Sequence, residues 1–269
     1  MSRRGREVPL VAVLLALVAV AFFVLPLVGL LKRAPWGELW DDLDDPVARD
    51  AIRLSVECSL WSTAFAVLFG VPLAYVLARA RFPGRALVRA LVVLPMVLPP
   101  VVGGVALLSA FQRNGGLVGG WMYDGFGFQF TFSKWGVVLA ETFVAMPFLV
   151  ITVEAGLRSM DRRYEDAAAS LGAGRWTVFR RVTVPMIAPA LIAGSALAWA
   201  RALGEFGATI TFAGNIQGRT QTTPLAVYNL LESDQSLAIA LSLVLLAVSV
   251  VVLVSLRDHW FGGLRDAGR

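Results

Sequence analysis

Long apolar runs separated by short charged segments dominate this chain. Four uncharged runs are each more than twenty residues long: Val8–Leu31, Cys58–Ala78, Ala90–Gln112 and Gln235–Leu256. Two further runs hold internal charges: Gly136–Gly156 and Met186–Phe206. An α-helix rises 1.5 Å per residue, so about twenty apolar residues cross the hydrocarbon core of a bilayer. The pattern predicts an all-α, polytopic membrane protein with six transmembrane helices.

Composition excludes a soluble protein and several kinds of chemistry. Only 16% of the 269 residues are charged, whereas a soluble domain has about a quarter. Cys58 and His259 are single residues of their type, so we predict no disulfide within the chain, no Ser-His-Asp triad, no metal site and no catalytic residue. The two lysines, Lys32 and Lys134, do not follow a glycine. The phosphate-binding Walker loop is therefore absent, and any ATP chemistry belongs to another polypeptide.

The distribution of basic residues predicts the orientation of the spans. Sixteen of the 24 Lys and Arg fall on one side if the six runs cross the membrane: Arg3, Arg4, Arg6, Arg79, Arg81, Arg85, Arg89, Arg158, Arg162, Arg163, Arg175, Arg180, Arg181, Arg257, Arg265 and Arg269. This side is predicted to be the cytoplasm, so both termini are cytoplasmic. The acidic loop Trp36–Asp50 then lies outside. The net charge of +5 reports topology, and we expect no nucleic-acid binding.

The first run admits one alternative, a cleaved signal peptide. Its 24 apolar residues exceed the 7–15 usual for a signal peptide. Lys32 and Arg33 also follow the run, where small residues would be expected. We therefore predict a retained first helix at 8–31.

A polar segment, Tyr164–Pro185, separates the fourth and fifth spans. Asp161 is a candidate N-cap, and a helix that starts there would hold acidic residues in its first turns, which the helix dipole favours. Gly172 and Gly174 are expected to end this helix, and Pro185 suits the first turn of the next one. Two interpretations are open: an amphipathic helix lying on anionic lipid, or a docking element for a partner protein.

Two charged residues lie in the fifth span. Arg201 and Glu205 are four residues apart, which places them on one face of a helix. A charge at this depth is costly unless it is paired or hydrated. The pair is either a structural ion pair within the helix, or Arg201 lines a hydrated path and lowers its barrier for an anion.

The residue order in the polar segment resembles the coupling motif of ABC-importer permeases. That motif is Glu-Ala-Ala, three residues, Gly, nine residues, then Ile-x-Leu-Pro; here Asp166-Ala-Ala, Gly172 and Val182-Thr-Val-Pro185 stand at the same spacing. Asp166 replaces the glutamate, and valines replace the Ile and Leu. In the family this loop docks into a cleft on the ATPase subunit. The resemblance implies these coupling residues: Glu165, Asp166, Ala167, Ala168, Ser170, Leu171, Gly172, Ala173 and Pro185.

A second resemblance concerns the transported substrate. Ala200–Thr209 is similar to a signature of oxyanion-importer permeases, while Ala213–Tyr228 and Leu94–Gly103 look closest to the molybdate branch. The likeness covers about residues 50–256, within a single permease domain of residues 1–269. It implies a candidate translocation path that includes Pro99, Pro100, Arg201, Glu205 and Thr209. The prolines of the third span should also bend that helix, which a span lining a cavity tolerates.

The resemblance implies a permease subunit that imports molybdate across the prokaryotic plasma (inner) membrane. It is not itself an enzyme: it holds no cofactor, while ATP and Mg belong to a partner ATPase subunit. Further expected partners are a periplasmic or extracellular oxyanion-binding protein, membrane lipid and a second copy of the chain. Sulfate, thiosulfate or tungstate are alternative substrates. An ion-coupled secondary transporter is the alternative from a different class, and it would show internal repeats and coupling charges near the midplane.

Overall fold

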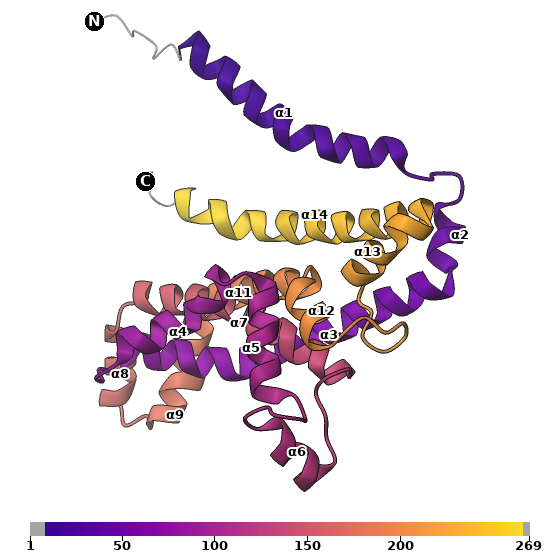
Figure 1. Ribbon diagram of the computed structural model, residues 1–269. Coiled ribbons are helices and arrows are strands. Elements are labelled where there is room, and N and C mark those ends of the chain that lie inside the picture. The colour runs from indigo at the N-terminus through magenta and orange to yellow at the C-terminus, as the bar shows by residue number, and fades with distance from the viewer. Residues whose placement is uncertain (1–8, 266–269) are drawn as a thin grey trace, which may run out of the picture.

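The computed structural model describes residues 9–265, with side chains through Ser255. Every regular element in this range is helical (Figure 1). The elements are α1 (Leu10–Arg33), α2 (Leu39–Asp44), α3 (Pro46–Arg79), α4 (Arg85–Val97), α5 (Pro100–Phe111), α6 (Gly119–Phe126), α7 (Lys134–Ser159), α8 (Arg163–Ser170), α9 (Arg175–Val178), the π-helix η1 (Phe179–Thr183), α10 (Val184–Met186), α11 (Ala188–Leu203), α12 (Gly207–Phe212), α13 (Thr223–Ser233) and α14 (Gln235–Arg265). The predicted all-α fold is confirmed.

The predicted count of six transmembrane helices is not confirmed. By length and composition, four helices of the described chain can cross a membrane, namely α1, α3, α7 and α14. A fifth crossing results if Arg175–Met186 and α11 form one span, although the two are bent by 73°. The third predicted span, Ala90–Gln112, is divided between α4 and α5. The predicted and observed numbers of spans therefore differ because the third and fifth predicted spans are interrupted in the structure.

Consecutive prolines explain why the third span is broken and not merely bent. Leu98 precedes Pro99 and has extended backbone angles, φ −64° and ψ 135°, as the residue before a proline prefers. Pro99 is extended as well, and Pro100 then occupies the first turn of α5, where a missing N–H costs nothing. The helix therefore ends and starts again within three residues.

The core lies where α3, α7 and α11 pack together. Small residues permit close approach: a Cβ added at Gly70 of α3 would lie 3.0 Å from Leu149 of α7, and one at Gly156 of α7 would lie 2.5 Å from Ala190 of α11. Large apolar side chains, including Leu77 and Leu157, are fully buried beside these contacts. Packing through small residues is typical of helices in a membrane, where close van der Waals contact drives association.

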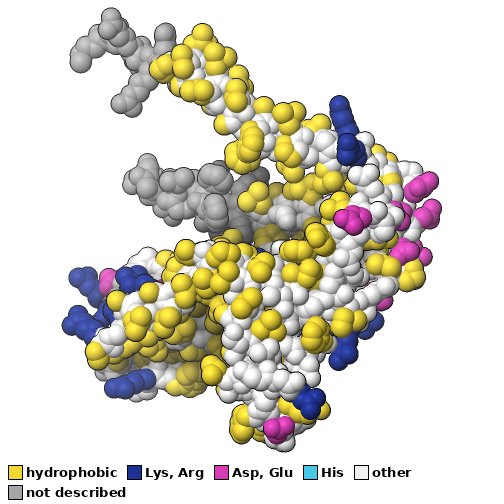
Figure 2. All heavy atoms as spheres, viewed as in Figure 1, with side chains coloured by type: hydrophobic (Ala, Val, Ile, Leu, Met, Phe, Trp, Pro, Cys, Tyr) yellow, Lys and Arg dark blue, Asp and Glu magenta, His cyan; other side chains and the backbone are white. Residues whose placement is uncertain are grey.

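Helix α1 stands apart from this core in Figure 1, and none of its residues is buried. Its exposed side chains are apolar along nearly its whole length, as the yellow surface in Figure 2 shows. Such a helix is stable in hydrocarbon but not in water. The structure therefore supports the prediction that residues 8–31 include a membrane-spanning helix.

Charge is distributed along the long axis of the molecule. In Figures 1 and 2, basic side chains cluster near α4 and α8 at the left, and the acidic side chains of α2 lie at the right. The first turn of α1 and the last turns of α14 also point to the left. The basic side chains thus gather at one end of the molecule and the acidic ones at the other, and the assignment of the basic end to the cytoplasm stays a prediction. Several residues of that prediction lie outside the described structure or its described side chains: Arg3, Arg4, Arg6, Arg257, Arg265 and Arg269.

We predict that Gly104→Ala destabilises the protein much more than Gly103→Ala. A Cβ at Gly104 would lie 2.6 Å from Thr211 Cβ and 3.0 Å from the Ala208 carbonyl oxygen, so α5 and α12 must separate. Overpacking of this kind costs about 1–3 kcal/mol. At Gly103 the added Cβ meets only the movable ring of Phe143. Thermal unfolding in detergent measures both variants, and equal melting temperatures would contradict the close contact.

Candidate functional site

The polar segment between α7 and α11 forms a helix, a turn and a second helix. The N-cap of the first helix is Arg162, so the prediction of Asp161 at that position is wrong by one residue. Asp161 Oδ1 still accepts a hydrogen bond of 3.0 Å from the Arg163 N–H, at the start of the helix. Gly172 has a left-handed backbone, φ +84°, and its N–H donates to the Ala169 carbonyl. Glycine adopts this conformation without a steric penalty. The predicted end of the first helix at Gly172 is confirmed.

One face of this segment is exposed and partly apolar. The exposed fractions are 90% for Leu171, 71% for Trp176 and 57% for Tyr164. Asp166, Ala167 and Ser170 are exposed as well, while Ala168 and Ala173 are half-buried. Large exposed apolar side chains beside small residues are typical of a surface that a partner protein covers.

Glu165 does not belong to this exposed face, although the coupling motif groups it with Asp166. Its Oε1 accepts a hydrogen bond of 2.7 Å from the Thr183 hydroxyl. Its Oε2 lies 3.1 Å from Nε of Arg79, at the end of α3. Successive residues of a helix point about 100° apart, so Glu165 turns toward the protein while Asp166 turns outward.

Pro185 explains the π-helix that precedes it. Proline has no N–H, and its ring clashes with the carbonyl four residues earlier in a regular helix. Here the turn before Pro185 widens into η1, and Pro185 occupies the first turn of α10. The predicted position of Pro185 at the start of a helix is confirmed, but that helix is only three residues long.

A cavity of about 570 Å³ lies between α3 and the second part of the segment, and among its lining residues are Pro72, Tyr75, Trp176 and Phe179. Phe179 contacts Tyr75 edge to face and stacks on Trp176, with ring centroids 5.1 and 5.6 Å apart. The sequence pattern of the segment did not reveal Tyr75, because it lies about a hundred positions earlier, in the apolar part of α3.

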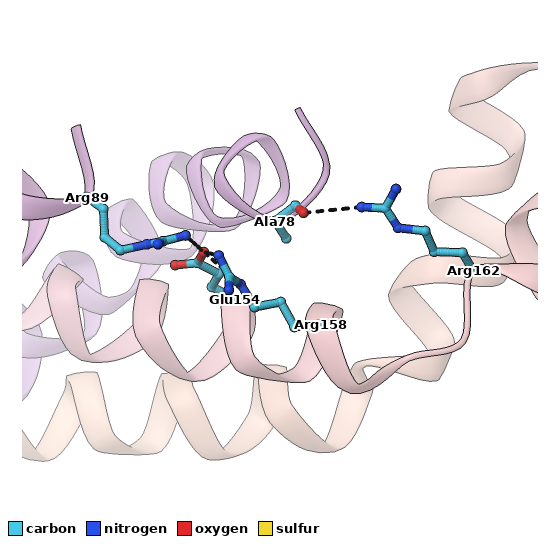
Figure 3. A network of polar contacts seen from close by, with 5 residues as sticks. All are labelled: Ala78, Arg89, Glu154, Arg158 and Arg162. Carbon is cyan, nitrogen blue, oxygen red and sulfur yellow. Dashed lines mark hydrogen bonds and ion pairs between the residues drawn. The ribbon is translucent and has the colours of Figure 1, made fainter. Parts of the chain in front are cut away.

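Ionic contacts join the helices at this end of the molecule, as Figure 3 shows. Glu154 of α7 is nearly buried and accepts hydrogen bonds from Arg89 of α4, at 2.5 Å, and from Arg158, one helical turn away. Arg162, just before α8, donates to the Ala78 carbonyl at the end of α3, at 3.5 Å. These contacts tie α4 to α7 and the start of the polar segment to α3.

Arg201 and Glu205 form an ion pair, one of the two predicted arrangements, but they do not lie on one helix. Helix α11 ends at Leu203, so the prediction of a single helix face is wrong. Arg201 Nη2 nevertheless lies 2.6 Å from Glu205 Oε2, and Glu205 Oε1 accepts a hydrogen bond of 2.7 Å from the Ala208 N–H. Glu205 therefore stabilises the start of α12 as well as the charge of Arg201. The Glu205 side chain is 1% exposed and that of Arg201 is 28% exposed.

The interruptions of the third and fifth spans meet each other. A Cβ at Gly207 would lie 2.7 Å from Cβ of Pro100, so α12 packs against the first turn of α5. Pro99 is exposed, whereas Thr209 is fully buried and its hydroxyl has no hydrogen-bond partner in the described chain. The structure thus brings Pro100 against the start of α12, two residues after Glu205. Gly207 was not singled out from the sequence, because its role depends on contact with Pro100.

We predict that Glu205→Ala lowers the free energy of unfolding by about 3–5 kcal/mol, because it leaves the largely buried Arg201 without its anion. It also removes the acceptor of the Ala208 N–H. Glu205→Gln keeps an acceptor and should fall between the parent and Glu205→Ala. Thermal unfolding in detergent gives the order, and a parent-like melting temperature for Glu205→Ala would rule out this role.

Comparison with known proteins identifies the family. Residues 66–260 match the family described as binding-protein-dependent transport system inner membrane component. The molybdenum transport system permease protein ModB of Mycobacterium tuberculosis is 45% identical over 239 residues, which cover 89% of this chain and 90% of that protein. The sulfate transport system permease protein CysT of Escherichia coli is 42% identical over 156 residues, 58% of this chain and 56% of CysT.

The fold is also found in a solved structure. A crystal structure of a bacterial alginate ABC transporter, in complex with an alginate pentasaccharide-bound periplasmic protein, contains a chain similar to this one with a TM-score of 0.73. The likeness covers 93% of both chains at 19% identity, so it concerns the fold alone. The long match to the family, supported by this fold, shows that the chain belongs to the binding-protein-dependent transport system inner membrane components, as a multi-pass membrane protein.

Proposed function

We propose that this protein is the permease subunit of an ABC importer that moves molybdate into the cytoplasm. The main support for molybdate as the substrate is the similarity to ModB, which covers 89% of the chain. The match to the sulfate permease CysT covers only 58% of it. Membership of a family of transport components agrees with the lack of a nucleotide-binding loop in the sequence. ATP and Mg are therefore assigned to a separate ATPase subunit.

The exposed face of α8 and the following turn is the proposed contact with the ATPase. Leu171 and Trp176 would otherwise expose large apolar surfaces to the cytoplasm. The coupling residues of this face are Asp166, Ala167, Ala168, Ser170, Leu171, Gly172 and Ala173, with Pro185 at the start of the following helix. In this arrangement the basic end of the molecule, with both termini, is cytoplasmic.

A binding protein on the opposite side would deliver the oxyanion, and a second copy of the chain would complete the permease. A periplasmic protein is present in the complex of the similarly folded alginate transporter. One chain carries one coupling segment, and an ATPase dimer has two clefts, so symmetry calls for two copies. Arg201, Glu205, Pro99, Pro100 and Thr209 remain the proposed path, with the partly exposed guanidinium of Arg201 as the group that would meet an anion.

We predict that deletion of the gene abolishes uptake of radiolabelled molybdate in cells without a second molybdate system, and that the intact gene restores it. Tungstate in excess should compete, because it has the same charge and tetrahedral shape, and sulfate should compete less. Competition by sulfate as strong as by tungstate would favour a sulfate permease instead. Uptake in vesicles that have an ion gradient but no ATP would contradict the ABC mechanism.

We predict that Gly172→Arg abolishes ATP-driven uptake, while the protein still inserts in the membrane. No atom lies within 4 Å of an added Cβ at this position, so the side chain would project outward, onto the face proposed for the ATPase. Gly84→Arg is the matched control. It too has a left-handed backbone, φ +82°, and free space, but it lies outside the polar segment.

Both variants bear the same backbone penalty of about 1–2 kcal/mol. Co-purification of the ATPase and uptake should therefore be lost in Gly172→Arg and retained in Gly84→Arg. Equal uptake by the two variants would argue against docking at Gly172.

A further inference from the structure

The inward face of α8 is fastened to two other parts of the molecule. On one side, Glu165 lies 3.1 Å from Arg79 at the end of α3. On the other, Glu165 accepts a hydrogen bond from Thr183, in the π-helix that leads into α10 and α11. A second contact, from Arg162 to the Ala78 carbonyl, joins the same two helix ends and is seen in Figure 3. Glu165 thus connects segments 18 and 86 positions away in the chain.

Burial distinguishes this ion pair from the other charges of the segment. The side chains of Arg79 and Glu165 are 12% and 14% exposed, and Thr183 is fully buried. The neighbouring pair of Arg163 and Asp161 is largely exposed, with 3.9 Å between its atoms. Exposed pairs contribute little to stability or geometry. Loss of one partner of a mostly buried pair leaves a charge without compensation.

The charge of the Arg79 side chain is compensated mainly by Glu165. Its Nε and Nη2 atoms are buried and donate no well-aligned hydrogen bond to any described residue. Glu165 is the only carboxylate of the described chain that pairs with it. The contact is therefore held mainly by charge, and removing the charge of Glu165 would release Arg79.

We propose that Glu165 is a positioning residue, which joins α8 to the cytoplasmic end of α3 and to the start of the fifth span so that these elements move as one body. The anchor consists of Arg79, Glu165 and Thr183. This inference rests on the proposed function, in which the ATPase moves α8. Asp166, Leu171 and Gly172 would receive the motion on the outward face, and the anchor would pass it to the transmembrane helices.

Packing gives the motion a direct route to the interrupted spans. Helix α3 packs along α7 and α11 through the core, and α11 ends at the Arg201–Glu205 pair. Without the anchor, the remaining side-chain hydrogen bond of the described chain between the start of the segment and α3 would be the long one from Arg162 to the Ala78 carbonyl, at 3.5 Å. Movement of α8 would then pass less completely to α3 and α11.

The first test compares Glu165→Gln with Asp161→Asn in complexes reconstituted in liposomes with the ATPase and the binding protein. Glu165→Gln keeps an acceptor for Thr183 and removes the charge. Asp161→Asn makes the same chemical change at an exposed site two residues before α8. We expect both variants to bind the ATPase and hydrolyse ATP. The number of molybdate ions transported per ATP should fall about fivefold or more in Glu165→Gln alone, as loss of a coupling free energy near 1 kcal/mol implies.

Two results would overturn the proposal. Parent-like transport per ATP in Glu165→Gln would show that the charge is not needed. Loss of ATPase binding in this variant would place Glu165 at the docking surface instead. The parent complex, measured in the same liposomes, tests the proposed function separately, because its failure to move molybdate with ATP would contradict that function whatever the variants do.

A covalent link in place of the ion pair tests the same idea through a gain of transport, whereas the first test relies on a loss of transport. Arg79→Cys and Glu165→Cys are combined in a protein whose single cysteine has been removed by Cys58→Ala, and a short bismaleimide links the two thiols. The unlinked variant should transport less molybdate per ATP than the Cys58→Ala parent, and the link should restore transport. A linked protein that remains uncoupled would show that α8 and α3 must separate during transport, which is the opposite of the proposal.

Discussion

Close contact among α3, α7 and α11 supports every other feature of this protein. Glycines and alanines allow the three backbones to approach, and leucine and valine side chains fill the space beside them. Within a bilayer, water is not expelled when helices associate, so such contacts must provide the stability. The three helices carry Arg79, Glu154 and Arg201 at their ends. Their packing therefore sets the positions of the ionic contacts on which coupling and the candidate path depend.

Interrupted helices expose backbone polar groups, which hydrocarbon cannot satisfy. The molecule places its interruptions where other groups provide partners. The break before Pro100 lies against Gly207, and the start of α12 receives a hydrogen bond acceptor from Glu205. Because Glu205 also pairs with Arg201, one buried carboxylate stabilises both a broken backbone and a membrane charge. The structural and functional interpretations of this pair are compatible, since the ion pair forms and Arg201 keeps an exposed edge.

The polar segment has two faces with different tasks. Its outward face exposes Leu171, Trp176 and the left-handed turn at Gly172. Its inward face holds Glu165 between Arg79 and Thr183. A motif read along the chain groups Glu165 with Asp166, but the helix turns the two carboxylates apart. In the proposed mechanism, one face receives the movement of the ATPase and the other transmits it to the membrane helices.

Local chemistry, which is visible in the sequence, predicted the all-helical membrane class, the end of α8 before Gly172 and a distortion of the third span at its prolines, although it predicted a bend and the structure has a break. These features follow from hydrophobic length and from the backbone limits of glycine and proline, and both act over a few residues. Tertiary structure alone decided that α11 stops before Glu205, that Pro100 meets Gly207, and that Glu165 faces Arg79. Each of these depends on which distant helices lie together. A periodic apolar pattern cannot specify this, because every lipid-facing side chain in such a chain looks like a core side chain.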